Sequence, residues 1–536
     1  MLDPERIDAI ARLRSALEAT GYMRPETATA LGVPLGSEPR RIDLPLYLRR
    51  LDPDSPLHTL IRLFALHLPA CEAHARAALA PLELGEAEAV GLVEARDGEV
   101  VPLVGLVVTE GLVLARDRPE AGSAALRPDH VVGLNPPALL LARLTVRRNV
   151  RSALDLGCGG GVQALLAARH CQRVVGVDLN PRAVVFARFN ARLNGVLNVE
   201  FREGDLFAPV ADERFELVVC NPPYVVSPET DLLFRDGGRS GDSFCEEVVR
   251  GAARHLAPDG FATVIVNWVA PEGEHWSGPL RHWVAGAGCD AWLLHLDTSD
   301  TLGYAAAWNR EADPERYAAA LDRWMAYYTS HGIRSIGMGA VVLRQRRSGA
   351  PWLLASELPA RPAAAASAEI LQAFATQDFL DTLAEPVALR GARFRVADHV
   401  RVDQVAAPRE FGFAVDRSEL RLAGALPFVG TADAGTLRLL QLSDGRRTLG
   451  EVAAAMAGTG EDAGEDAGAL AASVGETARR LAALGFLVPA EEAGERGDDG
   501  VAVQFGSTAS DAAAPGASGG GGARRPRDRP SRLGAG

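Results

Sequence analysis

Residues 151–178 read RSALDLGCGGGVQALLAARHCQRVVGVD. Two short apolar runs, SALDL and VVGVD, flank a glycine-rich turn and an apolar segment with helical spacing. This pattern is typical of a strand, a tight turn, a helix and a second strand that lies parallel to the first. Short apolar runs continue to alternate with helical stretches as far as about Arg347. We therefore expect a doubly wound α/β domain there.

A glycine cluster fills the turn between the first strand and the helix. Glycine has no Cβ, so the backbone there can approach a ligand closely. Gly157, Gly159 and Gly161 are spaced as Gly-x-Gly-x-Gly, whereas dinucleotide-binding turns use Gly-x-Gly-x-x-Gly, a distinction that Gly160 blurs. Asp155 lies just before the first glycine, where a carboxylate would repel a pyrophosphate but suits a cationic ligand.

Acidic residues follow at the ends of the next two expected strands. Asp178 ends the run RVVGVD, where a carboxylate can bind both ribose hydroxyls of an adenosine, and Asn180 opens the next helix. Asp205, followed by Leu206, ends the third strand and could accept a hydrogen bond from the adenine amino group. Acids at three successive strand ends, together with the glycine turn, predict a nucleotide-type ligand at the switch point of the sheet.

The fourth expected strand, FELVVC, runs directly into the loop Asn221-Pro222-Pro223-Tyr224. The prolines stiffen this loop and remove amide donors, so its carbonyls are free to point into a site. The side-chain oxygen of Asn221 and the carbonyl of Pro222 can each accept one N–H bond from a planar nitrogen, which would aim the nitrogen lone pair. The same bonds would stabilise the positive charge that develops on that nitrogen when it receives a methyl group from a sulfonium. Tyr224 can stack on the planar group that carries the nitrogen. The loop Asn221 to Tyr224 is therefore the expected catalytic site.

Together these motifs resemble the class I S-adenosylmethionine-dependent methyltransferases that methylate planar nitrogen. That group comprises the glutamine-N5 methyltransferases of release factors (the HemK/PrmC type), the adenine-N6 DNA and RNA enzymes, and the guanine-N2 ribosomal RNA enzymes. The resemblance covers Arg151 to about Arg347 and implies a Rossmann-like, seven-stranded core that uses S-adenosylmethionine. The expected cofactor-binding residues are Asp155, Gly157, Gly159, Gly161, Asp178, Asn180, Asp205, Leu206 and Asn221.

Two details favour the glutamine branch of this group. The extended loop NPPYVVSP, residues 221–228, is similar to that of the eukaryotic and archaeal release-factor methyltransferases. Residues 236–242, DGGRSGD, are similar to the Gly-Gly-x-Asp-Gly segment of glutamine methyltransferases, although Ser240 replaces the usual acid. In that branch Asn221 and Pro222 are implied to hold the substrate amide, so the expected substrate is a protein resembling a release factor. The alternative is an adenine-N6 or guanine-N2 methyltransferase that acts on a flipped base of RNA or DNA.

The rest of the chain divides into flanking regions that match neither the usual bacterial nor the eukaryotic form of these enzymes. Residues 387–490 contain LRLLQLSDGRRTLGEVAAAM and ETARRLAALGFLVPA, which resemble helices and the wing entry of a winged-helix fold. The predicted divisions are an N-terminal α+β accessory domain (1–147), the methyltransferase domain (148–347), an Ala/Pro-rich linker (348–386), the winged-helix-like domain (387–490) and a disordered, Gly-rich tail (491–536).

The composition limits the range of functions. A net charge of −13 weighs against generic nucleic-acid binding, although all 56 basic residues are arginine and five of them lie in the tail between Arg524 and Arg532. The six cysteines show no Cys-x-x-Cys spacing, so neither a disulfide framework nor a metal site is expected. The chain shows no signal peptide and no apolar run of about 20 residues, so we expect a cytoplasmic protein without a membrane segment.

Two other classes of protein are weaker alternatives. A cofactor-binding subunit without catalytic activity is disfavoured by the complete Asn221 to Tyr224 loop. A nicotinamide-dependent oxidoreductase is disfavoured because nothing resembling a hydride-transfer site accompanies the glycine turn. The sequence leaves open whether a small activator subunit is needed.

Overall fold

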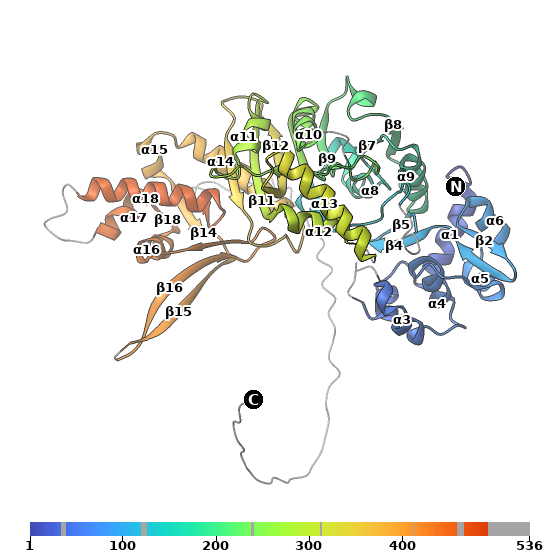
Figure 1. Cartoon of the computed structure of the whole chain (residues 1–536). Helices are drawn as coiled ribbons and strands as arrows, with labels where there is room; N and C mark the ends of the chain where they lie inside the picture. Colours follow the sequence, from blue (N-terminus) through green and yellow to red (C-terminus); the bar gives the residue numbers. More distant parts are fainter. Residues whose placement is uncertain are drawn as a thin grey trace, which may run out of the picture. The chain divides into compact units, whose positions relative to one another are not determined.

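Within the described residues, an eight-stranded sheet forms the centre of the chain (Figure 1). This computed structural model describes residues 1–33, 39–118, 126–236, 241–310, 313–409, 411–457 and 466–490. The strands of the sheet are β6 (Val150–Leu156), β7 (Cys171–Asp178), β8 (Val199–Glu203), β9 (Phe215–Cys220), β10 (Leu256–Val269), β11 (Cys289–Asp300), β12 (Ser335–Gln345) and β13 (Leu353–Glu357).

The strands lie in the order β13-β11-β12-β10-β9-β6-β7-β8. Neighbouring strands are parallel except where β12 runs antiparallel to β10 and β11. The α/β class predicted from the sequence is confirmed. The predicted count of seven strands is wrong, because β13 adds an eighth strand beside β11 at the edge of the sheet.

The stretch 348–386 is not the linker that its composition predicts. Its run LLASE forms β13, which pairs with β11 from Leu353 to Glu357. Helix α14 (Ser367–Thr382) follows, and its buried residues include Ile370 and Phe374. Alanine and proline suggested an open spacer, but the apolar residues among them pack against the domain.

Helices connect the strands in the described part of this domain. They are α7 (Pro136–Leu144), α8 (Val162–Ala167), α9 (Pro181–Leu193), the short turn η3 (Ala208–Val210), α10 (Ser243–Arg254), α11 (Gly278–Val284), α12 (Thr301–Asn309) and α13 (Pro314–Ser330). Helices α12 and α13 contact each other and lie as a yellow-green pair in Figure 1.

The parallel strands place the loops of interest at one edge of the sheet. The central strand β9 is buried from Leu217 to Cys220, as is typical of strands covered on both faces. Because β6, β7, β8 and β9 are parallel, their carboxyl ends meet at the same edge. The glycine turn, the acids and the Asn221 loop follow these ends directly, so the topology brings them together.

The N-terminal part is a mixture of short helices and two small sheets, β1-β3-β2 and β4-β5. Its helices are α1 (Ile7–Thr20), α2 (Glu26–Leu31), η1 (Arg41–Asp43), α3 (Leu44–Arg50), α4 (Pro56–Leu60), η2 (Ile61–Ala65), α5 (Glu72–Leu79) and α6 (Leu84–Val90). Its strands are β1 (Ala70–Cys71), β2 (Val93–Arg96), β3 (Glu99–Pro102), β4 (Gly105–Thr109) and β5 (Leu112–Arg116).

Two asparagine side chains, one within α9 (Asn190) and one at its C-terminal cap (Asn194), form with β5 the hydrogen bonds that a neighbouring strand would form. Asn194 accepts a hydrogen bond from the Val113 N–H (2.9 Å) and donates one to the Val113 carbonyl (2.7 Å). Asn190 accepts from the Ala115 N–H (2.7 Å) and donates to the Ala115 carbonyl (3.1 Å). The N-terminal part is thereby attached to the helix that follows the second strand of the methyltransferase sheet.

The C-terminal part contains α15 (Pro386–Gly391), β14 (Arg393–Val396), β15 (Val400–Arg409), β16 (Gly412–Leu422), β17 (Phe428–Thr431), α16 (Ala434–Leu442), β18 (Asp444–Thr448), α17 (Leu449–Ala457), α18 (Asp466–Ala483) and β19 (Leu487–Pro489). Strand β14 pairs with both β18 and β19. Strands β15 and β16 form a long antiparallel ribbon (Figure 1).

Met1–Glu491 forms one compact unit, and apart from the linker 348–386 the predicted domain boundaries within it stay predictions. The tail 491–536, which we expect to be disordered, lies outside the described residues. None of the described helices combines the length and the apolar character needed to cross a membrane.

Candidate active site

A cavity of about 340 Å³ opens at the carboxyl ends of β6, β7 and β9. This volume lies in the usual range for small-molecule and cofactor sites. Gly161 and Tyr224 do not line it. The predicted site residues that line it are Asp155, Gly157, Gly159, Asp178, Asn180, Asp205, Leu206, Asn221, Pro222 and Pro223.

The glycine turn forms one wall of the cavity. Gly157 and Gly159 have φ values of +68° and +52°, a conformation that residues with a Cβ rarely adopt. A Cβ added to either residue would meet no atom within 4 Å, so it would point into open space where a ligand can approach the backbone. Gly161 has φ +84°, and a Cβ there would come within 3.2 Å of Ala187 and Phe201. Gly161 is therefore required by packing beneath the turn, which explains its place outside the lining.

The carboxylate of Asp155 lies at the buried base of the cavity. One of its carboxylate oxygens accepts a hydrogen bond from the Ala164 N–H in α8 at 2.8 Å. Burial raises the pKa of Asp155 to about 7, and the nearby charge of Asp178 acts in the same direction. A bound cation would favour the ionised form of this carboxylate, so the site suits the positively charged ligand predicted from the sequence.

Asp178 lies at the tip of β7 and is oriented by the backbone. Its two oxygens accept hydrogen bonds from the Gly159 N–H (2.7 Å) and the Asn180 N–H (2.9 Å). Burial raises the pKa of Asp178, although these two bonds oppose that shift. A carboxylate oxygen can accept more than one bond, so the group can still receive two hydroxyls from a ligand.

Asn180 lines the cavity, but its side chain is engaged in the protein. It caps α9 by accepting a hydrogen bond from the Arg182 N–H (3.0 Å) and donates one to the Asp129 carbonyl (2.9 Å). Asp205 is exposed at the rim of the cavity, and Leu206 follows it with φ +46°. The side chain of Asn180 therefore stabilises the start of α9, whereas Asp205 and Leu206 are accessible to a ligand.

Asn221 continues from the buried end of β9. Its Oδ1 is buried and makes no hydrogen bond to any described residue. An acceptor of this kind is costly to bury without a donor, so it indicates that a ligand supplies one. Pro222 and Pro223 line the same cavity and have no N–H that could compete for the oxygen.

Tyr224 is 8% exposed and lies behind the cavity wall. Its ring meets the ring of Trp308 edge-on, with centroids 6.4 Å apart and an interplanar angle of 70°. The sequence places Tyr224 in the catalytic loop correctly, but it does not indicate that the ring is covered by α12. That contact joins residues far apart in the chain and carries no local signal.

Several supporting residues were missed by the sequence analysis. Asn190 is fully buried and donates a hydrogen bond to the Gly160 carbonyl (2.9 Å), so the residue that holds β5 also holds the glycine turn. Arg182 pairs with Asp117 (2.7 Å) and donates to the Asp129 carbonyl (2.9 Å). These bonds fix the segment just before His130, which lines the cavity. Only the polar character of Asn190 within an apolar helix could have suggested such a role.

The Gly237-Gly238 segment and Ser240, used to favour the glutamine branch, lie outside the described residues. In the described part of the chain, no three His, Cys, Asp or Glu residues lie together as a metal site would require.

The chain matches two family models. The methyltransferase small domain matches residues 135–274, which contain the glycine turn, the acids and the Asn221 loop. A domain of unknown function (DUF7059) matches residues 19–103 in the N-terminal part.

Relatives with assigned names match less than a third of this chain. A release factor glutamine methyltransferase of Geobacter sulfurreducens is 33% identical over 186 residues, which are 30% of this chain and 65% of that protein. A Methanocaldococcus jannaschii protein named "Putative protein N5-glutamine methyltransferase" is 30% identical over 156 residues, 28% of this chain and 78% of that protein. A ribosomal protein uL3 glutamine methyltransferase of Bradyrhizobium diazoefficiens is 34% identical over 168 residues, 29% of this chain and 49% of that protein.

These matches identify the class of the domain that contains residues 135–274: it is an S-adenosylmethionine-dependent methyltransferase domain. The chain belongs to the family of class I S-adenosylmethionine-dependent methyltransferases that includes the N5-glutamine methyltransferases. It spans just under two thirds of the Geobacter relative and about half of the Bradyrhizobium relative.

Proposed function

We propose that this protein transfers a methyl group from S-adenosylmethionine to the side-chain amide nitrogen of a glutamine in a protein substrate. The observation that carries the proposal is the buried Oδ1 of Asn221, which has no donor among the described residues and borders the cavity. A substrate carboxamide has two N–H donors on the nitrogen that must be methylated. The names of the relatives, which specify glutamine in release factors and in ribosomal protein uL3, support the same acceptor.

The proposed catalytic role of the loop is to orient the acceptor. When bound, the cofactor supplies a methyl group on a positively charged sulfur. Asn221 Oδ1 and the Pro222 carbonyl would each accept one N–H bond, which turns the nitrogen lone pair toward the methyl group. Both oxygens would also stabilise the positive charge that develops on the nitrogen, so no strong base is needed.

In this proposal Tyr224 stacks on the substrate amide once its ring is uncovered. Stacking on the amide requires the ring to become uncovered, because α12 packs against it and only 8% of the residue is exposed. Pro223 would keep the loop stiff beside it.

The cofactor residues are proposed to act by position and charge. Asp178 would bind the ribose hydroxyls, and Asp205, at the rim, would accept from the adenine amino group. Gly157 and Gly159 would let the cofactor approach the backbone, because both have positive φ and open space beside Cα. Asp155 would interact with the positively charged end of the cofactor.

The flanking parts are proposed to select the protein substrate. In the C-terminal part the order α16, β18, α17, α18, β19 is compatible with a winged-helix-like domain, and such domains often dock proteins. The α+β N-terminal part is attached through Asn190 to the glycine turn, so it is in a position to influence the cofactor site.

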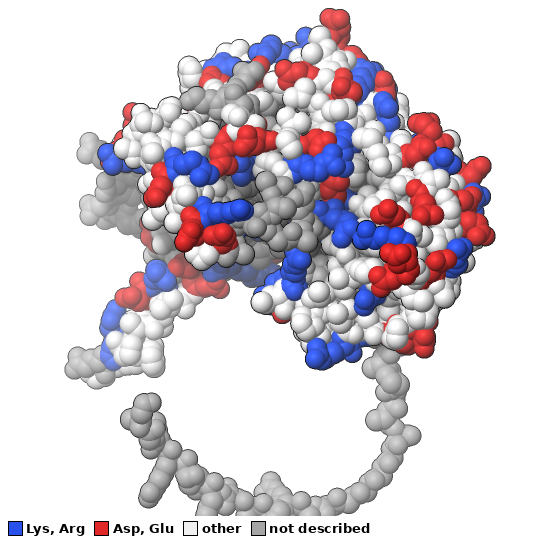
Figure 2. Space-filling model, turned by 45° about the vertical axis from the view of Figure 1, so that its right-hand side comes forward, with Lys and Arg blue, Asp and Glu red and all other residues white. Residues whose placement is uncertain are grey.

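A nucleic-acid base as the acceptor is less favoured. The net charge of the chain is −13, whereas nucleic-acid binding usually requires a basic surface. Figure 2 shows acidic and basic side chains interspersed on the face that it draws. The relatives described above are all named for glutamine.

The experiment is methyl transfer from labelled S-adenosylmethionine into host cell extract, followed by digestion with protease or nuclease. We expect label that protease releases and nuclease does not, and we expect Asn221→Ala to abolish transfer while cofactor binding persists. Asn149→Ala, which changes an exposed asparagine before β6, serves as the matched control and should transfer normally. Label released by nuclease alone, or normal turnover by Asn221→Ala, would refute the proposal.

A further inference from the structure

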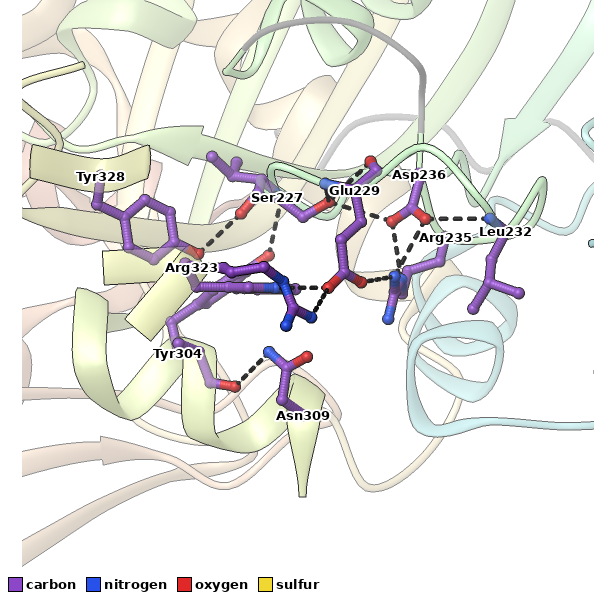
Figure 3. Close-up of polar contacts among 12 residues, drawn as sticks. Ser227, Glu229, Leu232, Arg235, Asp236, Tyr304, Asn309, Arg323 and Tyr328 are labelled. Carbon is purple, nitrogen blue, oxygen red and sulfur yellow. Dashed lines mark hydrogen bonds and ion pairs between the residues drawn. The ribbon is translucent and has the colours of Figure 1, made fainter. Parts of the chain in front are cut away.

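The chain inserts α12 and α13 between the last two antiparallel strands of the sheet, β11 and β12. Figure 3 shows side chains from this helical pair directed at the segment that follows the Asn221 loop. Trp324 and Tyr328 of α13 are fully buried, so the pair is packed firmly against the domain. The contacts described next are polar and converge on residues 226–229.

Two tyrosine hydroxyls hold both backbone groups of Val226. The Val226 N–H donates to the Tyr304 hydroxyl of α12 (3.3 Å), and the Val226 carbonyl accepts from the Tyr328 hydroxyl of α13 (2.8 Å). Val226 is fully buried, so no water competes for these bonds. The residue lies only two positions beyond Tyr224. Its backbone is thus bound to helices rather than to a neighbouring strand.

Glu229 anchors the same segment a few residues further on. Its carboxylate accepts a hydrogen bond from the Trp324 indole N–H (3.1 Å) and from Arg323 (3.2 Å), and it also pairs with Arg235 (Figure 3). Burial alone would raise the pKa of Glu229, but the hydrogen bonds from Trp324 and Arg235 outweigh it and hold the pKa below its usual value. Glu229 therefore stays ionised at neutral pH and keeps its partners.

The far end of the segment is attached to the same helix. The Gly241 N–H donates to the hydroxyl of Tyr327 in α13 at 3.0 Å. Within the segment, the Ser227 hydroxyl donates to the Asp236 carboxylate (3.1 Å), which also accepts from the Leu232 N–H (3.1 Å). Helix α13 thus forms hydrogen bonds with Val226 and Glu229, which follow the Asn221 loop, and with Gly241 further along the chain.

We propose that Tyr304, Trp324 and Tyr328 form a clamp that positions the Asn221 loop for methyl transfer, so that the inserted helices set the geometry of the acceptor site. This inference rests on the proposed function, because it assigns positioning residues to the same reaction. The clamp residues are not among those that line the cavity. They act through the backbone of Val226 and the carboxylate of Glu229, which continue directly from the loop.

The physical reason is the sensitivity of transfer to the position of the acceptor nitrogen. A displacement of about 1 Å can reduce a rate about 100-fold when the reacting atoms must be aligned. The Asn221 oxygen lies five residues before Val226, on a loop stiffened by two prolines, so movement at Val226 is transmitted to it. The cofactor acids lie on other strands and are not attached to the clamp.

The test uses Tyr304→Phe, Tyr328→Phe and the double variant in the full chain. Each change removes one hydroxyl and keeps the ring that packs in the domain. Tyr317→Phe is the matched control, because Tyr317 is on α13 and, among the described residues, its hydroxyl forms no hydrogen bond with residues 226–229. The measurements are kcat and KM with the protein substrate, the cofactor Kd, and hydrogen exchange at the amides of Asn221, Tyr224 and Val225.

We expect the double variant to lose about 10- to 100-fold in kcat with the cofactor Kd unchanged and with faster exchange at the three loop amides. Tyr317→Phe should match the wild type in all of these. The clamp is overturned if kcat is unchanged, or if kcat and cofactor binding fall together in proportion to a lower melting temperature, as a merely structural role predicts.

The two proposals fail in different ways. If the wild-type protein methylates no glutamine, the proposed function fails, whereas the exchange measurement needs no acceptor and still tests the clamp. Equal exchange at the loop amides in the wild type and in the double variant would then overturn the clamp as well. Faster exchange confined to the variants would support it independently.

Discussion

At the scale of single residues, Asp178 is the side chain on which cofactor binding most depends in this account. Its two backbone bonds orient both oxygens toward the cavity and leave room for two more donors. We predict that Asp178→Ala weakens cofactor binding by about 100-fold or more, because the two lost hydrogen bonds to a charged group contribute about 1.5 to 3 kcal/mol each. Titration calorimetry of the purified variant measures this directly.

The control for that prediction is Asp212→Ala, which removes an exposed carboxylate in the loop before β9. It should bind the cofactor as the wild type does. An unchanged cofactor Kd in Asp178→Ala would mean that the ribose is held elsewhere.

Asp155 gives a prediction about pH. Burial raises its pKa from 3.8 to about 7 in the folded protein. Between these values the folded state keeps a proton that the unfolded state has lost, so the contribution of Asp155 to the free energy of unfolding falls as the pH rises through this window. Asp155→Asn cannot titrate, and its amide oxygen can still accept the bond from Ala164.

We therefore predict that Asp155→Asn gains stability relative to the wild type as the pH rises from about 5 to about 7, and that the gain then levels off. Urea unfolding of both proteins across this range, without cofactor, measures the difference. A difference that stays constant with pH would show that Asp155 does not titrate there.

Individual residues differed in how well the sequence predicted them. Asp155, Asp178 and Asn221 stand directly at strand ends, so position in the chain was enough to bring them into one cavity. Asn190 acts across a contact with the distant Gly160 and Ala115, which a local pattern does not encode. The contact between the rings of Tyr224 and Trp308 also joins residues that are far apart in the chain, so a local pattern does not encode it either.

At the scale of elements, an ion cluster attaches the unexpected strand and helix to the sheet. Asp290 of β11 is fully buried and accepts hydrogen bonds from Arg344 (2.9 Å), Arg346 (3.1 Å) and the Trp352 N–H (3.1 Å) just before β13. Arg344 continues to Asp378 of α14 at 2.6 Å. The cluster thus connects β11 and β12 with the start of β13 and with α14.

We predict that Asp290→Ala destabilises the protein by about 3 kcal/mol, because it leaves two half-buried guanidinium groups and the Trp352 N–H without their shared buried partner. Chemical unfolding followed by circular dichroism measures the loss. Asp381→Ala removes an exposed partner of Arg346 (2.8 Å) and should cost no more than about 1 kcal/mol. Equal costs for the two variants would contradict the buried role of Asp290.

Elements with strong periodicity were predictable, and the others were not. The strands β6 to β10 follow from apolar runs that end at glycine, proline or acidic residues. Strand β13 has five residues within an Ala/Pro-rich stretch, so composition favoured a linker and concealed the eighth strand. Its pairing with β11 is a tertiary effect that outweighs local propensity.

At the scale of the whole molecule, the methyltransferase sheet is predictable and the choice of substrate is not. The role proposed for the loop Asn221 to Tyr224 requires a planar nitrogen as the acceptor, which glutamine and the nucleic-acid bases share. The buried Oδ1 of Asn221 supports a planar nitrogen as the acceptor. The names of the relatives and the net charge of −13 support the proposal of glutamine over a base.

The most direct measurement is the chemical identity of the methylated product. Wild-type protein and Asn221→Ala are incubated with labelled S-adenosylmethionine and a protein fraction of the host, which is then hydrolysed enzymatically to free amino acids and analysed by mass spectrometry. We expect labelled N5-methylglutamine with the wild type and none with the variant. Label in any other amino acid, or in a methylated base from residual nucleic acid with no N5-methylglutamine, would contradict it.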